Sequence, residues 1–338
     1  MLLLLACFPE LTPPDGLTDN PNVDYDGDGY TVNEGDCDDA DAERYPGNCD
    51  TGVEGDTDTD TDADSDTDSD ADSDSDTDTD VAIAPEYLYF AELHLNAIYR
   101  SDLSTGATKV VVGGLGDPVG VAVDRKNGWV YWADGSAISR ATLEGGATET
   151  VATDLGTARE VAVDATLERV CWTTTTSVQC KNFEGESVMD HTSVGLPVGI
   201  ALDPVNRHVW WSEYTSGKIV RANLDGTGVT DVYTGLTQLS GIDLDIENER
   251  IFWTQNSTRL AVAPLAGGEI VDIVTTGLEG NAGIAWDGTH SWLYYSNNGQ
   301  NQIKRVRLDG SDPETFVSTA EVAGLNEPRH VTLDGYVP

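Results

Sequence analysis

An internal repeat that spans residues 82–338 constrains the fold of this chain more than any other feature. One repeated element has the pattern Gly-hydrophobic-x-hydrophobic-Asp, and its copies lie at 120–124, 160–164, 199–203, 241–245, 283–287 and 330–334. A second element is an aromatic pair followed by small and polar residues, with copies at 89–92, 131–134, 171–174, 210–213, 252–255 and 294–297. Successive aromatic copies are 42, 40, 39, 42 and 42 residues apart, a spacing typical of repeat architectures such as propellers.

Each repeat has room for one propeller blade. Both elements alternate hydrophobic residues with others, as β-strands do. Further segments, such as 138–145 and 110–112, indicate a third and a fourth strand. Four strands in about 41 residues is the size of a blade.

The two ends of the repeat region complete each other. The first aromatic pair, Tyr89-Phe90, has no Gly-hydrophobic element before it, and the last such element, 330–334, has no aromatic pair after it. Pairing these terminal strands in one blade removes two free sheet edges. We therefore predict an all-β domain over 82–338, a six-bladed β-propeller with terminal-strand closure.

These residues resemble the YWTD repeats of low-density lipoprotein receptor class B domains over essentially all of 82–338. The segments 131–134 (Tyr-Trp-Ala-Asp) and 196–203 (Leu-Pro-Val-Gly-Ile-Ala-Leu-Asp) come closest. The resemblance implies a six-bladed propeller used for protein–protein binding, with no catalytic residues to carry over. No blade has an intact YWTD sequence, so the partners of the receptors are not assumed for this chain.

The third aromatic element begins with Cys171 in place of an aromatic residue. A hairpin that turns at Thr175-Thr176 would place Cys171 opposite Cys180, close enough for a disulfide after a small adjustment. Three other repeats combine an acid after the aromatic pair with an Arg on the next strand, which predicts an ion pair in each. The pairs are Glu92 with Arg100, Asp134 with Arg140 and Glu213 with Arg221. We predict that the disulfide replaces this ion pair.

The first 80 residues differ from the repeat region in composition. They carry 27 of the 60 acidic residues but a single basic residue, Arg44, whereas all eight Trp lie beyond residue 128. The hydrophobic core is therefore expected in the repeats. Nucleic acid is excluded as a partner because phosphate binding needs clustered Lys and Arg. Divalent cations and basic partners suit the net charge of −42.

Residues 24–50 contain an acidic motif with the spacing of a calcium site. Asp at positions 1, 3 and 5 and Gly at position 6 match the first half of an EF-hand loop, although Gly35 stands where the bidentate Glu would be. The motif resembles the calcium repeats of thrombospondin type 3 and of bacterial surface proteins, which implies a structural calcium ion. The expected ligands are Asp24, Asp26, Asp28, the Tyr30 carbonyl, Asp36 and one or more of Asp38, Asp39 and Asp41. A disordered acidic tail is the alternative.

The cysteines favour an oxidising compartment. A Cys37–Cys49 disulfide would close the acidic loop around the ion, and with Cys171 and Cys180 it makes an even set of four. Zinc binding is the competing interpretation, but no CxxC or nearby His pair supports it.

Residues 51–81 are predicted to be a disordered linker. From Asp56 to Asp80 every second residue is Asp, and such a chain cannot bury a core. Self-repulsion extends it, which suits a stalk resembling the Ser-Asp repeats of bacterial adhesins. A simple spacer is equally consistent with the composition.

The start of the chain resembles a truncated lipoprotein signal, residues 1–7, with a lipobox that ends at Cys7 and a flexible segment over 8–23. The basic n-region is missing, so either the true start lies upstream or the Leu run is a coincidence. No stretch approaches the ~20 apolar residues of a membrane span. We therefore expect membrane contact only through a lipid anchor, at an extracellular or cell-surface location, as in an outer-membrane lipoprotein of a bacterium.

Five charged residues interrupt the pattern of the innermost strands. Arg159-Glu160 and Arg329-His330 stand where other repeats have small residues ending in Gly, and Asp243 replaces Ala. These residues predict a ligand-binding rim around the central channel. The alternative is that they are solvated and merely tolerated.

Three functions remain open from the sequence. The first is a surface-anchored, monomeric module that binds a protein, peptide or glycan. The second is a lactonase- or lyase-like propeller enzyme with a metal in the channel, although no HExxH, GxSxG or phosphate-binding Gly loop supports catalysis. The third is a structural envelope protein. Fold alone does not choose among them.

The acidic motif generates a direct test. Asp28→Asn removes one of the converging carboxylates, so we expect the full chain to bind calcium about tenfold more weakly or worse, as measured by isothermal titration calorimetry. The matched control, Asp60→Asn, makes the same charge change in the Asp-rich linker and should leave the tight site unaltered. Equal affinity in both variants would contradict the predicted site.

Overall fold

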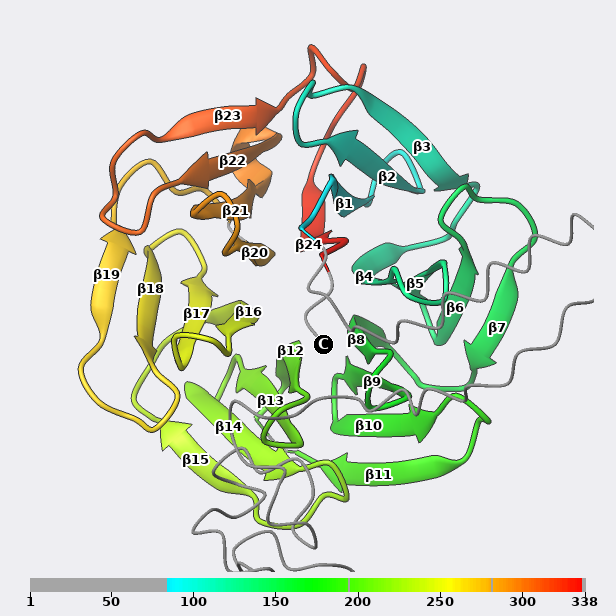
Figure 1. The fold of residues 1–338 in the computed structure, drawn as a ribbon, viewed down its shortest axis with the longest axis vertical. Helices are drawn as coiled ribbons and strands as arrows, with labels where there is room; N and C mark the ends of the chain where they lie inside the picture. Colours follow the sequence, from blue (N-terminus) through cyan, green and yellow to red (C-terminus); the bar gives the residue numbers. More distant parts are fainter. Residues whose placement is uncertain (1–83, 194, 281, 336–338) are drawn as a thin grey trace, which may run out of the picture. The chain divides into compact units, whose positions relative to one another are not determined.

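The computed structural model describes residues 84–193, 195–280 and 282–335. They form six four-stranded antiparallel sheets arranged as blades around a central channel (Figure 1), which confirms the predicted six-bladed β-propeller. In each blade one strand faces the channel and the fourth lies at the periphery (Figure 1). The predicted calcium motif, linker, lipobox and Cys37–Cys49 disulfide lie outside the described residues.

The blades are numbered here from the one that contains the first strand, and their strands are given from the channel outward. Blade 1 holds β24 (Pro328–Leu333), β1 (Tyr87–Glu92), β2 (Ala97–Asp102) and β3 (Thr108–Gly113). Blade 2 holds β4 (Pro118–Asp124), β5 (Trp129–Asp134), β6 (Ala137–Thr142) and β7 (Glu149–Ala152). Blade 3 holds β8 (Ala158–Asp164), β9 (Arg169–Thr174), β10 (Ser177–Asn182) and β11 (Ser187–Thr192).

The other three blades follow the same order. Blade 4 holds β12 (Pro197–Asp203), β13 (His208–Glu213), β14 (Lys218–Asn223) and β15 (Thr230–Tyr233). Blade 5 holds β16 (Leu239–Asp245), β17 (Arg250–Gln255), β18 (Arg259–Pro264) and β19 (Val271–Val274). Blade 6 holds β20 (Ile284–Asp287), β21 (Trp292–Asn297), β22 (Gln302–Val306) and β23 (Glu314–Val317), with the 3-10 helix η2 (Asn298–Gln300) between β21 and β22.

The ring closes within blade 1, as predicted from the two incomplete ends. The last strand, β24, pairs antiparallel with the first, β1, so that Leu88 lies opposite Leu333 and Phe90 opposite Val331. The C-terminal Gly-hydrophobic element thereby supplies the inner strand that the N-terminal aromatic element lacks.

The aromatic pairs account for the packing between blades. Because successive side chains of a strand point to opposite faces, the two aromatic residues of one blade enter two different cores. Tyr131 of blade 2 packs in one cluster with Trp172 of blade 3, while Trp132 packs on its other side with Tyr89 of blade 1. The same arrangement recurs around the ring, up to the cluster that joins Tyr294 of blade 6 to Phe90 of blade 1.

The repeated Asp at the end of each inner strand has a structural role. Its carboxylate accepts the backbone N–H three residues later, for example from Asn127 to Asp124 at 2.9 Å and from Asn206 to Asp203 at 2.9 Å, which fixes the turn into the second strand. In blade 1, Asp334 accepts the N–H groups of Glu86 and Tyr87 at the start of the first strand. The Asp therefore ties the C-terminal strand to the first strand.

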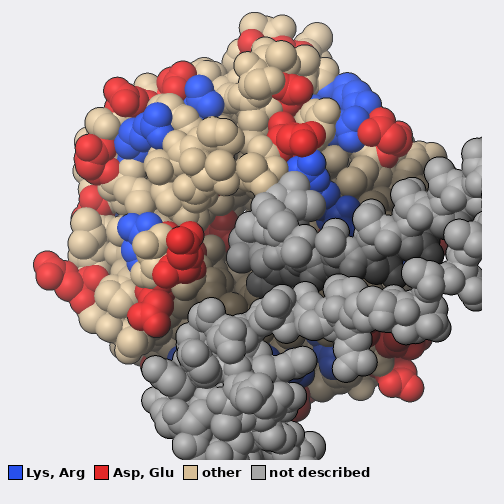
Figure 2. All heavy atoms as spheres, viewed as in Figure 1, with Lys and Arg blue, Asp and Glu red and all other residues tan. Residues whose placement is uncertain are grey.

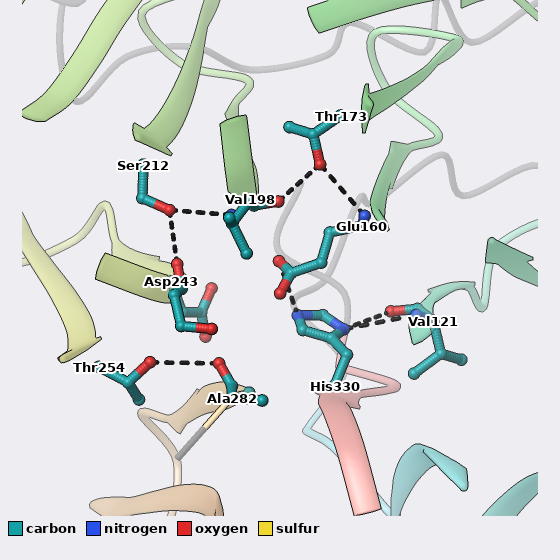
Figure 3. Close-up of polar contacts among 12 residues, drawn as sticks. Val121, Glu160, Thr173, Val198, Ser212, Asp243, Thr254, Ala282 and His330 are labelled. Carbon is teal, nitrogen blue, oxygen red and sulfur yellow. Dashed lines mark hydrogen bonds and ion pairs between the residues drawn. The ribbon is translucent and has the colours of Figure 1, made fainter. Parts of the chain in front are cut away.

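Hydroxyl groups after the aromatic pairs link neighbouring inner strands. Thr173 accepts the N–H of Glu160 in its own blade and donates to the carbonyl of Val198 in the next blade, at 3.1 and 2.6 Å. Ser212 bridges Gly199 and Ser240 in the same way, at 2.8 and 2.5 Å. These bonds satisfy backbone groups that the bulged inner strands leave unpaired (Figure 3).

The structure corrects the predicted ion pairs between the acid and the Arg of one blade. The acid at the end of the second strand accepts hydrogen bonds from loop groups, as Asp134 does from the N–H groups of Gly116 and Asp117 and Glu213 does from the hydroxyls of Ser193 and Ser216. The Arg lies opposite the first aromatic residue, so that Arg140 faces Tyr131, donates to its hydroxyl at 3.2 Å and pairs with Glu149. An ion pair was wrongly inferred because sequence distance alone did not show which residues lie opposite each other.

The predicted Cys171–Cys180 disulfide is present, and the two residues lie opposite each other across β9 and β10. They occupy the positions that Tyr131 and Arg140 hold in blade 2. The disulfide therefore replaces the cross-strand aromatic–Arg pair, and the proposed replacement of an acid–Arg ion pair was wrong.

The hydroxyl bridges predict a stability effect. Ser212→Ala leaves a buried N–H and a carbonyl without their partner, so we expect the free energy of unfolding to fall by about 1–3 kcal/mol in urea denaturation. Blades 1 and 2 carry Ala91 and Ala133 at this position, which argues against steric damage. Ser187→Ala, at an exposed site on β11, is the matched control and should change stability by less than about 0.5 kcal/mol. A similar loss in both variants would refute the role given to the bridge.

Candidate functional site

In four of the six blades the inner strand approaches its neighbour so closely that one position of the repeat requires glycine. A Cβ atom at Gly199 would lie 2.5 Å from the carbonyl oxygen of Ser240, and one at Gly283 would lie 2.7 Å from the Cα of His330. Gly120 and Gly241 stand at the same position in their blades. The two remaining blades carry the long side chains of Glu160 and His330 at this position.

Glu160 and His330 come together although they lie on blades 3 and 1. Oε2 of Glu160 is 3.4 Å from Nε2 of His330, and the two side chains point toward each other across blade 2 (Figure 3). Nδ1 of His330 lies 3.0 Å from the carbonyl oxygen of Val121, to which it donates when it carries the ring proton. Glu160 is 3% exposed and His330 7%, which places both inside the channel and corrects the prediction that they stand on its rim.

Burial makes both groups neutral near pH 7. It raises the pKa of Glu160 to about 8, although a hydrogen bond from the Ile200 backbone and the nearby Arg159 charge oppose this shift. Burial also lowers the pKa of His330 to about 4, against the effect of its bond to Val121. Oε2 of Glu160 has no partner in hydrogen-bonding geometry among the described residues. A protonated acid thus faces a neutral imidazole.

Asp243 projects into the channel from β16, separately from this pair. Its carboxylate accepts the N–H of Leu244 at 2.8 Å and that of Trp286 on the next inner strand at 2.7 Å. Burial raises its pKa to about 6, although these two hydrogen bonds oppose the shift. Asp243 and His330 both line a cavity of about 620 Å³ whose walls are largely the apolar C-terminal halves of the inner strands. Asp243 therefore bridges two blades as well as facing the channel.

A second cavity, of about 570 Å³, lies where the inner strands begin. We call it the arginine mouth because Arg159 and Arg329 both line it. Its other described lining residues are Val198, Tyr214, Ser240, Asn256, Gly280, Ala282, Asn298, Gly299, Asn301, Asn326 and Glu327. The structure thus places the two predicted arginines at a channel mouth and the other three predicted residues deeper in the channel.

Sequence reasoning missed the polar loop residues of the arginine mouth. Tyr214, Asn256 and Asn298 each directly follow the aromatic element of their blade. Comparison of this one position across the repeats would have singled out three consecutive blades. Asn326 and Glu327 come from the loop before β24, where they stand at the positions of Gly116 and Asp117 in the corresponding loop of blade 2, since 324–328 (Gly-Leu-Asn-Glu-Pro) matches 114–118 (Gly-Leu-Gly-Asp-Pro).

The described residues contain no group of three or more His, Cys, Asp or Glu side chains that could hold a metal ion. None of the helices in this part of the chain is long and apolar enough to cross a membrane. Figure 2 shows Lys and Arg interspersed with Asp and Glu over the visible face of the blades. The visible face therefore carries both signs of charge. Arg159 and Arg329 are candidate functional residues because they line a cavity.

No protein-family model and no curated protein sequence matches the chain. Solved structures do match. A chain of the nidogen/laminin complex is similar with a TM-score of 0.65 and 24% sequence identity, over 73% of this chain and 98% of that chain. A protein of unknown function from Desulfotomaculum acetoxidans has a TM-score of 0.54 and 14% identity, over 73% and 98% of the two chains.

An enzyme is also among the similar structures. Virginiamycin B lyase from Staphylococcus aureus has a TM-score of 0.50 and 19% identity, over 63% of this chain and 73% of that chain. These likenesses support the β-propeller fold. They include a protein of a binding complex and a lyase, so they leave the choice between binding and catalysis to the site itself.

The buried acid in the channel predicts a pH-dependent stability. The contribution of Glu160 is present below about pH 4.5 and is lost as the pH rises toward 8, because the folded state must then ionise a buried carboxyl group. The contribution of His330 is present above about pH 6.5 and is lost as the pH falls toward 4. The window from pH 6.5 to 8 therefore isolates the effect of Glu160.

Glu160→Gln removes this titration and keeps a donor toward His330. We expect the free energy of unfolding of the variant, minus that of the unchanged protein, to rise by about 2 kcal/mol between pH 6.5 and 8 in urea denaturation. Glu184→Gln, at an exposed turn, should show no such trend. A pH-independent difference for Glu160→Gln would contradict the assignment of a buried neutral carboxyl group.

Proposed function

We propose that this chain is an extracellular, surface-anchored binding module whose propeller binds a protein ligand at the arginine mouth. The observation that carries the proposal is that this cavity gathers residues that depart from the repeat. Arg159 and Arg329 replace the small residues of the other inner strands, and asparagines from three loops surround them. Departures that converge on one concave surface point to a ligand, whereas merely tolerated substitutions would be scattered.

The similarity to a chain of the nidogen/laminin complex supports a protein ligand. That structure contains two proteins in one assembly, and this chain shares its propeller fold. Peptides and surface glycans remain within the same proposal, because the polar lining of the arginine mouth offers donors and acceptors for either.

The N-terminal part completes the proposed module. Cys7 would carry the lipid anchor, the 24–50 segment would hold calcium as a structural ion, and the Asp-rich linker would keep a monomeric propeller away from the surface. This arrangement would place the protein on the outside of a bacterial cell. It rests on the sequence motifs described above.

A propeller enzyme is the second candidate, and one observation favours it. Glu160 and His330 are a neutral acid and a neutral base 3.4 Å apart inside the channel, and opposed pKa shifts of this kind occur in active sites. The likeness to a lyase is consistent with this possibility. Binding is preferred because Glu160 is 3% exposed and lines neither of the two cavities, whereas Arg159 and Arg329 both line the arginine mouth.

Affinity capture with the full chain tests the binding function. We expect a protein from envelope extracts of the source cells to be retained by the unchanged chain and lost with Arg159→Gln/Arg329→Gln. The matched control, Arg169→Gln/Arg207→Gln, removes the same charge near the opposite ends of the inner strands and should retain the ligand.

Loss of the ligand in both double variants would assign binding to net charge and contradict the proposed location. Absence of any captured ligand, together with a transition-metal ion retained by the purified chain in addition to the calcium expected at 24–50, would overturn the binding module and favour the enzyme. Metal content is measured by mass spectrometry on the same preparations.

A further inference from the structure

We infer that the arginine mouth binds a single carboxylate, presented by an Asp or Glu side chain of an acidic peptide segment in the partner. This inference rests on the proposed binding function and adds the chemical class of the ligand. Three features of the cavity support it: which charged side chains are paired, the net charge of the lining, and the neutral amide groups around the charges.

Arg159 is the charged group of the cavity that has no counter-ion among the described residues. Its guanidinium makes no hydrogen bond or ion pair with any described residue, and its Nε is buried without a partner. Burial, together with the charge of Arg329, lowers its pKa, although nearby Glu160 opposes the shift. An arginine stays protonated in proteins, so a half-buried positive charge is left without compensation.

The adjacent charges do not neutralise Arg159. Arg329 is paired with Glu327 through a contact of 2.5 Å between Nη2 and Oε1, so these two charges cancel each other. Glu160, the next acid, is protonated near pH 7 because burial raises its pKa to about 8. The lining of the cavity therefore carries a net charge of one positive unit in a chain whose net charge is −42.

The net charge of one positive unit in the cavity favours one class of anion over another. A carboxylate balances it and matches the planar fork of the guanidinium with two parallel hydrogen bonds. A phosphate group carries more negative charge, and Glu327 at the same mouth would repel the excess. The geometry thus favours a carboxylate over a phosphorylated ligand.

The remaining lining suits a peptide backbone. Asn256 and Asn326 bring neutral amide groups from two loops, and amides can donate to carbonyl groups and accept from N–H groups. The cavity of about 570 Å³ has room for one side chain with its flanking backbone. The occupant is therefore an extended acidic segment with one residue inserted.

The test uses four peptides of nine residues, acetylated and amidated, that consist of Gly and Ser with a central Asp, Glu, Asn or phosphoserine. Dissociation constants for the full chain are measured by isothermal titration calorimetry at 150 mM salt. We expect the Asp or the Glu peptide to bind at least tenfold more tightly than the Asn peptide, since a charge-assisted pair is lost with Asn. Equal affinity for Asn, or tighter binding of phosphoserine, would overturn the inference.

Variants of the cavity locate the interaction. Arg159→Gln should weaken the Asp peptide at least tenfold, Arg159→Lys should weaken it less, and the exposed control Arg207→Gln should have no effect. Glu327→Gln frees Arg329 and should tighten binding several-fold, a gain that a misfolded variant cannot produce. The inference would be overturned if the Arg159 variants bound the Asp peptide as tightly as the unchanged chain does, or if Glu327→Gln did not tighten binding.

The outcomes separate this inference from the proposed function. A protein ligand captured by the full chain with equal affinity for Arg159→Gln would leave the binding module standing and refute the carboxylate site. Asp-dependent peptide binding that requires Arg159, with no protein ligand captured, would support the carboxylate site and count against the wider proposal.

Discussion

The stability of this propeller depends on cores that are shared between blades. Five blades contribute two adjacent aromatic residues to opposite faces. In blade 3 Trp172 packs against blade 2, and the disulfide cysteine Cys171, which replaces the other aromatic residue, packs toward blade 4. No single blade contains a complete hydrophobic core. Every blade therefore needs a neighbour on both sides, which only a closed ring provides. The pairing of β24 with β1 and the Asp334 contacts to the first strand supply this closure.

The same closure creates the constraint from which the site arises. In four of the six blades the inner strand lies so close to its neighbour that the repeat requires glycine, and hydroxyl groups such as those of Thr173 and Ser212 satisfy the backbone at the bulges. Where Glu160 and His330 replace glycine, their side chains lie inside the channel. Arg159 directly precedes Glu160 and Arg329 directly precedes His330, and both arginines line the arginine mouth.

Much of the fold could be predicted because the repeated units can be compared with one another along the sequence. The strand positions, the six blades, the closure and the Cys171–Cys180 bond followed from spacing and alternation, which are local properties of the chain. The cross-strand partner of Arg140 did not, because a register shift of a few residues changes which side chain it meets. The site was predicted in part: the five residues that break the repeat were found, but Asn256 and Asn298 come from loops whose positions depend on the whole ring.

By itself, the sequence determined the number of blades and the residues that break their pattern, because both are properties of a repeat compared with itself. Only the tertiary structure decided how those residues divide, with Glu160 beside His330 inside the channel and Arg159 at its mouth, where no described residue pairs with it. The physical reason is that charge pairing and burial depend on distances between blades that lie more than 100 residues apart in the chain, and no local pattern encodes such distances.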